Sequence, residues 1–491
     1  MSTPAPRPET YEPDPGRWRT LAVCLAVGFI TLLDVSVVNV ALPSIERSLD
    51  AGPTQLQLVV AGYTLAFGLV LVPAGRLGDA GWRRHLFIGG LIGFLLTSLA
   101  AGLAPTDDAL AVARLAQGVF AGMLNPQVVG LIQQQFRGFE RGRAFGLFGA
   151  TIGVSTAVGP LLGGVILAVA GEENGWRWVF GINVPIILVL LPFAWKYVPT
   201  SVRKAGPRHL DAVGLGLIGA ATVFVMYPFV TTSGVDDDPA RWWGLVVAAV
   251  ALVALVAWER RYQRRTGDAV LDPGLLRTPS FRNGAILGAA YFSGFTGVFL
   301  LTTLYLQNDL GYDPLAAGLV AMPFAVCSGV SAWLSGRLVH RWGRTVVVAG
   351  LVVVLVGMVS TDLAIRVIGD DPDVAGPVMA LTLAIAGAGS GLVISPNQTL
   401  ALADVPVERA GVAGSMIQLG QRIGSSLGIA AVLSLYYAGS AAGLGGAAAT
   451  GRALLVTITL VAVALVVSVV DLRARHAAGE QPDTNSGATP A

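Results

Sequence analysis

The chain has 491 residues, of which 54% are hydrophobic and only 13% are charged. A soluble globular protein carries roughly 25% charged residues, so folding in water could not bury this much apolar surface, and we expect the chain to lie in a lipid bilayer. The net charge of +2 gives no indication of a nucleic-acid partner. The two cysteines, Cys24 and Cys327, both lie in apolar runs, which argues against a disulfide framework.

Apolar runs long enough to cross a bilayer as helices of about 20 residues recur along the chain. The polar stretch 1–17 lacks the features of a cleaved signal peptide, so we expect a disordered cytoplasmic tail there and a second one at 473–491. In chain order, the predicted spans are 19–42, 55–75, 85–104, 109–133, 143–169, 178–196, 211–231, 242–258, 283–306, 315–336, 345–366, 375–398, 410–437 and 452–471. This pattern predicts an all-α integral membrane protein with fourteen transmembrane helices.

The positive charges provide a test of this count. With the N-terminus in the cytoplasm, two arginines, Arg114 and Arg422, fall within spans. The outside segments then contain only five of the 32 Lys and Arg residues, namely Arg47, Arg177, Arg241, Arg366 and Arg452. A missed span would invert this asymmetry downstream, so the positive-inside rule supports fourteen spans with both termini cytoplasmic.

A short basic loop occurs twice. The segment 75–84 (GRLGDAGWRR) ends the second span, and 336–345 (GRLVHRWGRT) ends the tenth. Basic loops at matching places in two apolar halves indicate a duplicated membrane transporter; receptors, membrane enzymes and simple anchors need no such duplication. The two six-helix halves would be 18–198 and 276–472, with 199–275 inserted as a transmembrane hairpin flanked by basic loops.

Two charged residues within spans are candidates for energy coupling. Burying a carboxylate at the depth of Asp34 costs about 2.5–3.5 kcal/mol on insertion scales, and such a group usually faces a polar cavity and titrates. Asp34 is therefore the expected proton site. Arg114 keeps its charge at any working pH and needs buried acceptors. The alternatives are structural: a contact at Asp34 that never titrates, and an arginine that joins the first and fourth spans.

The fifth span contains two glycines, Gly159 and Gly163, whose spacing puts them on one helix face and allows close backbone approach. Pro160 removes a backbone hydrogen bond and is expected to bend the helix. We interpret this segment as a bent, tightly packed helix between the two halves that prevents leakage. Ordinary packing of small residues is the alternative.

The repeated loops supply candidate gating residues on the cytoplasmic side: Asp79, Arg83, Arg84, His340, Arg341 and Arg344. They are expected to form ion pairs that close the inward gate and break on switching. Anchoring by the positive-inside rule would explain the arginines but not Asp79.

Other polar or aromatic side chains lie at depths where a substrate cavity is expected. Pockets for small molecules are mostly apolar with few polar groups, so these residues are candidate substrate contacts, with helix packing as the alternative role. They are Asn39, Tyr63, Asn183, Tyr291, Phe295 and Gln418.

The motifs, taken in order, carry a family resemblance. The segment 33–43 (LDVSVVNVALP) is similar to a first-helix signature, 114–118 (RLAQG) to a buried-arginine motif, and 176–185 (WRWVFGINVP) to a typical opening of the sixth span. The antiporter motif corresponds to Gly153, Gly159, Pro160, Gly163 and Gly164. The chain thus resembles the major facilitator superfamily, and within it the fourteen-span drug:proton antiporters.

This resemblance implies a major facilitator fold and an energy-coupling role for Arg114. The chain departs from the family pattern at Ala80 and Trp82, where an arginine and a glycine are usual. In the second copy of the loop, His340 stands where the first copy has Asp79. The thirteenth span offers glutamines and Arg422 where related pumps can carry a carboxylate, which weakens the inference of dicationic substrates.

The resemblance further implies proton-coupled export of lipophilic small molecules, cationic ones included, across the bacterial cytoplasmic membrane. This would be multidrug or antibiotic efflux from the cytoplasm or inner leaflet. The alternatives are export of an endogenous metabolite (a secondary metabolite, siderophore or lipid), proton:nutrient symport and a non-transporting membrane sensor. We expect a monomer that contacts substrate, protons and lipids, with no enzymatic activity, cofactor, metal site or nucleic-acid partner.

Overall fold

The structure is a computed structural model that describes residues 14–51, 55–56, 58–171, 173–200, 211–230, 238–266, 273–368 and 371–477. Within these ranges the chain is helical apart from short turns, and it contains no strand. The predicted all-α membrane fold is therefore confirmed. Most of the expected N-terminal tail and most of the C-terminal tail lie outside the described residues; α1 begins at Arg17 and α17 continues as a helix to Ala477.

In the part of the N-terminal half that the structure describes there are seven α-helices, two of them in the sixth span, and two π-helical turns. The α-helices are α1 (Arg17–Leu49), α3 (Tyr63–Leu77), α4 (Arg83–Gly102), α5 (Asp107–Gln135), α6 (Gly138–Ala170), α7 (Gly175–Gly181) and α8 (Asn183–Tyr197). The π-helical turns are η1 (Leu58–Gly62) and η2 (Gly78–Trp82).

The inserted hairpin and the C-terminal half follow. The hairpin comprises α9 (Ala212–Val230), η3 (Pro239–Trp242) and α10 (Trp243–Thr266). The C-terminal half comprises α11 (Pro273–Arg277), α12 (Pro279–Leu304), η4 (Tyr305–Asp309), α13 (Pro314–Trp342), α14 (Arg344–Ile368), α15 (Pro372–Ala401), η5 (Val407–Arg409), α16 (Ala410–Ala441) and α17 (Gly446–Ala477).

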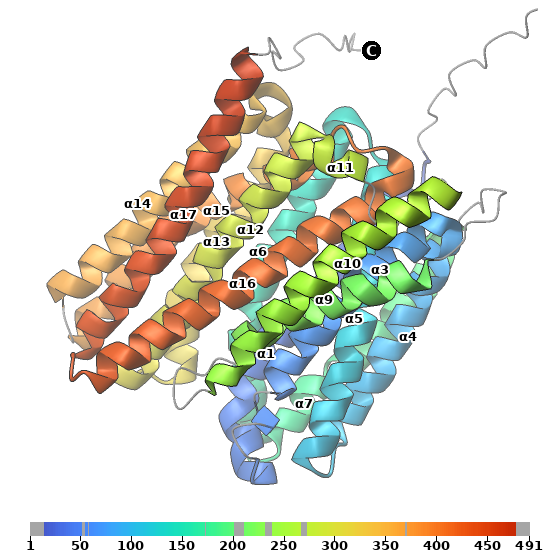
Figure 1. The fold of residues 1–491 in the computed structure, drawn as a ribbon. Helices are drawn as coiled ribbons and strands as arrows, with labels where there is room; N and C mark the ends of the chain where they lie inside the picture. Colours follow the sequence, from blue (N-terminus) through green and yellow to red (C-terminus); the bar gives the residue numbers. More distant parts are fainter. Residues whose placement is uncertain are drawn as a thin grey trace, which may run out of the picture.

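Among the described residues, 13 helical stretches are long and apolar enough to cross a membrane, and one of them crosses twice. This stretch, Leu58–Gly102, has 45 residues and would extend ~68 Å if it were straight, about twice the ~30 Å hydrocarbon core. The chain reverses at Gly81, whose φ of 100° is accessible to glycine at little cost. Because α3 and α4 flank α5 as separate helices (Figure 1), the described chain has fourteen crossing segments, as the sequence predicts.

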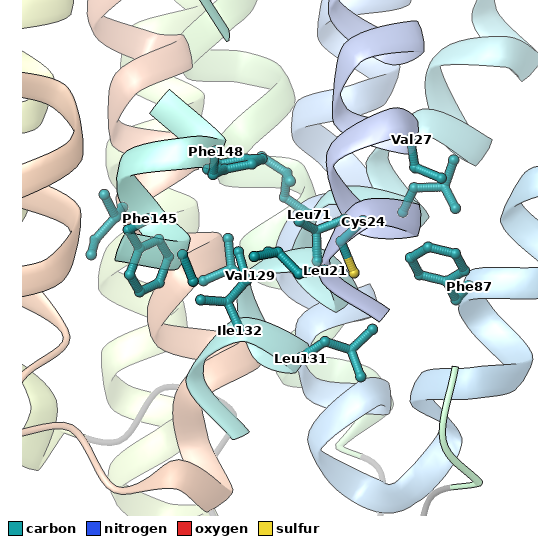
Figure 2. Packing of buried hydrophobic residues seen from close by; sticks show 14 of the residues in the cluster. Leu21, Cys24, Val27, Leu71, Phe87, Val129, Leu131, Ile132, Phe145 and Phe148 are labelled. Carbon is teal, nitrogen blue, oxygen red and sulfur yellow. The ribbon is translucent and has the colours of Figure 1, made fainter. Parts of the chain in front are cut away.

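The two halves are packed together on one face of the bundle. α1 begins and α17 ends on this face, at the top of Figure 1, and we call it the terminal face. One hydrophobic cluster near this face combines N-terminal-half residues such as Leu21, Phe87 and Phe145, which Figure 2 shows, with Val405 and Ala413 of the C-terminal half. The other two large clusters each lie within one half. The structure is therefore closed on the terminal face.

The inserted hairpin lies beside both halves. In α9, Met226 lies against Gly68 of α3, and Ile218 shares a small cluster with Val72 of α3 and with Met416 of α16. The hairpin therefore covers the seam between α3 and α16. The opposite seam is formed by direct packing of α6 against α13.

Candidate functional site

Asp34 lies near the middle of α1, and its carboxylate is surrounded by hydrogen-bond donors. Oδ2 accepts a hydrogen bond from Arg114 Nη1 at 2.5 Å, and Oδ1 accepts from Gln117 Nε2 at 3.0 Å and from Asn183 Nδ2 at 2.8 Å. The residue is only 3% exposed. Three donors from α5 and α8 therefore surround this carboxylate.

Arg114 of α5 has partners other than the carboxylate. Its Nε donates to the carbonyl of Val59 at 3.0 Å, and its Nη1 also donates to Gln117 Oε1 at 2.6 Å. The guanidinium lies 4.3 Å from the centroid of the Tyr63 ring, a cation–π distance. Val59 belongs to the π-helical turn η1, a local widening that often occurs at functional sites. These partners hold the guanidinium independently of Asp34.

Gln117 is a site residue to which the sequence analysis assigned no role. Its side chain bridges Arg114 and Asp34, and its Nε2 also donates to Ser98 Oγ of α4 at 2.8 Å. The available signal was its spacing: Gln117 lies one helical turn after Arg114 and therefore on the same face of α5.

A second cluster of contacts joins the two halves at the terminal face. The Asp79 carboxylate accepts hydrogen bonds from the backbone N–H groups of Gly411 at 3.0 Å and Val412 at 2.9 Å, and it pairs with Arg83 at 2.6 Å. The two N–H groups belong to the first turn of α16, where the helix dipole favours a negative charge. Arg83 is held in turn by Gly130 of α5, through its carbonyl. Asp79 of one half therefore binds a helix N-terminus of the other, an arrangement that we call the terminal lock.

The glycines of the fifth span face two different neighbours. A Cβ at Gly159 would lie 2.2 Å from Ser36 Cβ, and one at Gly163 would lie 3.3 Å from the Val37 carbonyl, so both glycines pack against α1 within the N-terminal half. This differs from the expectation that they lie between the halves. The other residues of the motif face the C-terminal half: Gly153, Pro160 and Gly164 lie against Gly329, Gly318 and Leu315 of α13.

Comparison with known proteins identifies the family. The model of the Major Facilitator Superfamily matches residues 24–429. The chain belongs to the major facilitator superfamily. It is 34% identical over 86% of its length to a probable actinorhodin transporter of Streptomyces coelicolor, covering 72% of that protein. It is also 36% identical over 85% of its length to a puromycin resistance protein of Streptomyces alboniger, covering 81% of that protein.

A third relative and two solved structures extend the comparison. The multidrug resistance protein Stp of Mycobacterium tuberculosis is 32% identical over 83% of this chain and 73% of its own length. The human organic anion transporter TETRAN superimposes with a TM-score of 0.64 at 14% identity, covering 91% of this chain and all of that one. A proton:xylose symporter gives a TM-score of 0.64 at 14% identity, covering 92% and 94%. These two structures show that the fold is shared.

The expected substrate contacts of this major facilitator protein lie in different places. Asn183 bonds to Asp34, and Tyr63 lies beneath Arg114 while its hydroxyl donates to the Thr31 carbonyl at 3.2 Å. Both residues therefore belong to the Asp34 network. Asn39 is exposed on α1.

The remaining expected contacts belong to the C-terminal half. Tyr291 is buried and stacks on Phe295, with 5.1 Å between the ring centroids. Phe295 also contacts Phe299 of α12 and Phe324 of α13, so these rings form an aromatic cluster within that half. Gln418 lies on α16, one turn before Arg422.

The described contacts of the other expected gating residues lie mostly within one half. Arg84 donates to the Trp195 carbonyl at 2.6 Å, at the end of the N-terminal half. Arg344 pairs with Asp471 at 2.6 Å, inside the C-terminal half. Arg341 is exposed, whereas His340 crosses the seam and contacts the Phe139 ring of α6. Among the expected gating residues, Asp79 bonds to the other half and pairs with Arg83, whereas the contacts described for Arg84 and Arg344 stay within one half.

The described part of the chain contains no group of three or more His, Cys, Asp or Glu side chains placed to hold a metal ion. The chemical feature that the site offers is a buried carboxylate. Asp34 is the carboxylate, and donors from α5 and α8 surround it.

Proposed function

We propose that this major facilitator protein is a proton-coupled exporter of lipophilic small molecules in the bacterial cytoplasmic membrane. The observation that carries the proposal is the buried Asp34–Arg114 pair, held by Gln117 and Asn183 in the core of the N-terminal half. A buried carboxylate in a membrane helix is costly and marks a functional site by default. Relatives named for antibiotic transport and drug resistance support efflux as the direction.

The orientation follows from the charge distribution. The basic loops at 75–84 and 336–345 lie on the terminal face, and the positive-inside rule assigns this face to the cytoplasm. The terminal lock then closes the transporter toward the cytoplasm. Both termini are cytoplasmic in this orientation.

The proposed cycle begins with a proton entering from outside and binding Asp34. Neutralisation removes the ionic part of the attraction to Arg114, while Val59 and Gln117 continue to hold the guanidinium. The change is transmitted to α6 because Ser36, two residues from Asp34, packs on Gly159. The terminal lock then opens, the proton leaves to the cytoplasm and substrate enters. Each inward proton releases about 2.3 kcal/mol per 100 mV of membrane potential.

Export of an endogenous secondary metabolite by the same machinery is a second candidate. Two relatives are named for actinorhodin transport and for tetracenomycin C resistance and export. The difference between the candidates lies in the molecule carried and not in the coupling.

The test is efflux of a panel of dyes and antibiotics from a host that lacks its own pumps, with and without a protonophore. We expect lower accumulation of some compounds in cells that express the protein, and loss of that difference when the protonophore is added. A protonophore-insensitive difference would contradict proton coupling. Equal accumulation of every compound, with the protein present in the membrane, would contradict efflux.

A further inference from the structure

Arg422 differs from the buried arginines of the membrane domain. Arg83, Arg114 and Arg344 each pair with a carboxylate. Within the ranges that the structure describes, the guanidinium of Arg422 makes neither an ion pair nor a hydrogen bond, and its recorded contact is with the ring of Phe67, 4.6 Å from the centroid. Since arginine keeps its charge at any working pH, this part of the protein carries an uncompensated positive charge.

The position of Arg422 is central in the membrane. It lies twelve residues into α16, ~18 Å from the cytoplasmic start of that helix. Residues 410–415 of the same helix are buried in the packing of the terminal face, whereas Arg422 is partly exposed. Neither α3 nor α16 contains Asp or Glu, so a carboxylate for this guanidinium is missing from both of the helices that it contacts.

Further groups at this position suit a ligand. Gln418 lies on the same face of α16 as Arg422, because residues four apart are neighbours on a helix. The amide of Gln418 likewise has no hydrogen-bond partner within the described ranges. Across from them, the rings of Tyr63 and Phe67 on α3 lie with their centroids 6.2 Å apart. Both rings are buried in this closed conformation. Aromatic side chains with a few polar groups are the usual composition of a small-molecule site.

This position is also shared by the two halves and adjoins the coupling network. Arg422 approaches Phe67 from the C-terminal half, while Arg114 covers Tyr63, one turn away on α3. Substrate at Arg422 and a proton on Asp34 would therefore occupy different places, one next to Phe67 and the other next to Tyr63. A site between the halves is where alternating access requires a substrate to bind.

We propose that Arg422 and Gln418 bind an acidic group of the transported molecule, next to the rings of Tyr63 and Phe67, so that the preferred substrates are lipophilic organic anions. The inference rests on the proposed export function and specifies its substrate class. A guanidinium binds a carboxylate through two parallel hydrogen bonds, and in a site of low dielectric constant it repels a cation strongly. Asp34 cannot offset this repulsion, because Arg114 already neutralises it.

The proposal has an electrical consequence. When one monoanion leaves in exchange for one entering proton, two elementary charges move in the same direction across the membrane. Exchange of a neutral molecule moves one charge, and exchange of a monovalent cation moves none. An inside-negative potential should therefore accelerate export of an anion even without a pH gradient.

The test uses the full-length protein in proteoliposomes and three fluorescent probes that share a pyrene body: a butyrate, its uncharged amide and a trimethylammonium derivative. We expect the butyrate to be exchanged for protons about ten-fold faster than the other two, the effect of one charge-assisted contact. We expect a potassium diffusion potential set by valinomycin to accelerate butyrate exchange most.

Substitution of the arginine separates the charge from the fold. Arg422→Gln should lower butyrate exchange to the rate of the amide and leave amide exchange unchanged, and Arg422→Lys should retain part of the preference for the butyrate. Arg452→Gln, an exposed arginine of α17, is the matched control and should change nothing. If Arg422→Gln does not reach the membrane, the wild-type order of the three probes and the Arg422→Lys variant carry the test.

The failure of this inference is distinguishable from failure of the proposed function. Equal exchange of all three probes, or faster exchange of the ammonium, overturns the anion site while leaving proton-coupled export intact. The anion site is also overturned if a compound from the dye panel is exchanged for protons and the butyrate does not compete with that exchange. If neither the probes nor any panel compound is exchanged for protons, the proposed function itself fails, and this inference with it.

Discussion

Asp34 and Arg114 form a buried ion pair, with 2.5 Å between Oδ2 and Nη1, and the other described contacts of both side chains lie in the same half of the protein. The candidate proton site is therefore contained in one half, whereas the terminal lock joins the two. A helix must therefore connect the candidate proton site to the terminal lock. α3 meets both requirements, because Tyr63 contacts Arg114 and Gly75, three turns later, packs on Ser415 of α16.

The first prediction concerns membrane orientation. In a variant that lacks Cys24 and Cys327, Asp371→Cys at the start of α15 should react with an impermeant maleimide in intact cells. Ala403→Cys, between α15 and α16, should react only in inverted vesicles. The opposite pattern would place the terminal face outside and refute the cytoplasmic lock. The sequence also predicts an external Asp237, which lies outside the described residues.

The terminal lock gives the second prediction. Asp79→Asn keeps the shape of the side chain but removes its charge, and with it the ion pair to Arg83 and the favourable interaction with the α16 dipole. We expect a loss of about 1–2 kcal/mol from the closed state, or roughly a ten-fold rise in the open population. The measurement is the labelling rate of Ser415→Cys, which is fully buried in this state, in inverted vesicles.

A matched control for the lock is Glu140→Gln. Glu140 pairs with Arg17 within the N-terminal half and is more exposed, so its loss should leave the labelling rate of Ser415→Cys unchanged. If Asp79→Asn and Glu140→Gln behave alike, Asp79 has no special role in closing the cytoplasmic side.

The third prediction concerns the glycines of α6. A methyl group at Gly159 would lie 2.2 Å from Ser36 Cβ, whereas one at Gly164 would meet only Leu315 at 3.8 Å. Gly159→Ala should therefore cost about 1–3 kcal/mol by overpacking, lower the melting temperature in detergent and slow transport. Gly164→Ala should be neutral. Adding Ser36→Gly to Gly159→Ala should restore both properties; a failure to restore them would show that the contact with α1 is not the cause.

The sequence was sufficient to predict the fold because its evidence is periodic and redundant. Fourteen apolar runs, the distribution of positive charge and a repeated loop all led to the same architecture. It also placed Asp34 and Arg114 at membrane depth. It could not show that they touch, because depth along each helix says nothing about how the helix is rotated or which helices are neighbours.

The same limit explains the differences at individual residues. Asn183 was expected to contact substrate but lies in the Asp34 network, since the rotation of α8 turns it toward α1. Gly159 was expected between the halves but faces α1, since the two faces of α6 have different neighbours. Arg422 was visible in the sequence as a charge within a span, but only the packing of α16 on α3 reveals that none of the described carboxylates accompanies it.

The central prediction is that Asp34→Asn uncouples the transporter without unfolding it. The amide keeps the size of the carboxylate and an oxygen that can accept from Gln117 or Asn183, and Arg114 retains Val59 and Gln117 as acceptors. It cannot take up a proton. We therefore expect the variant to reach the membrane at wild-type levels and to exchange substrate down its gradient, but to lose uphill efflux and substrate-induced proton release in proteoliposomes.

Asp108→Asn, which replaces an exposed carboxylate at the start of α5, is the control and should release protons as the wild type does. Proton release by Asp34→Asn at the wild-type rate would mean that Asp34 serves only to join α1, α5 and α8, and that another group carries the proton.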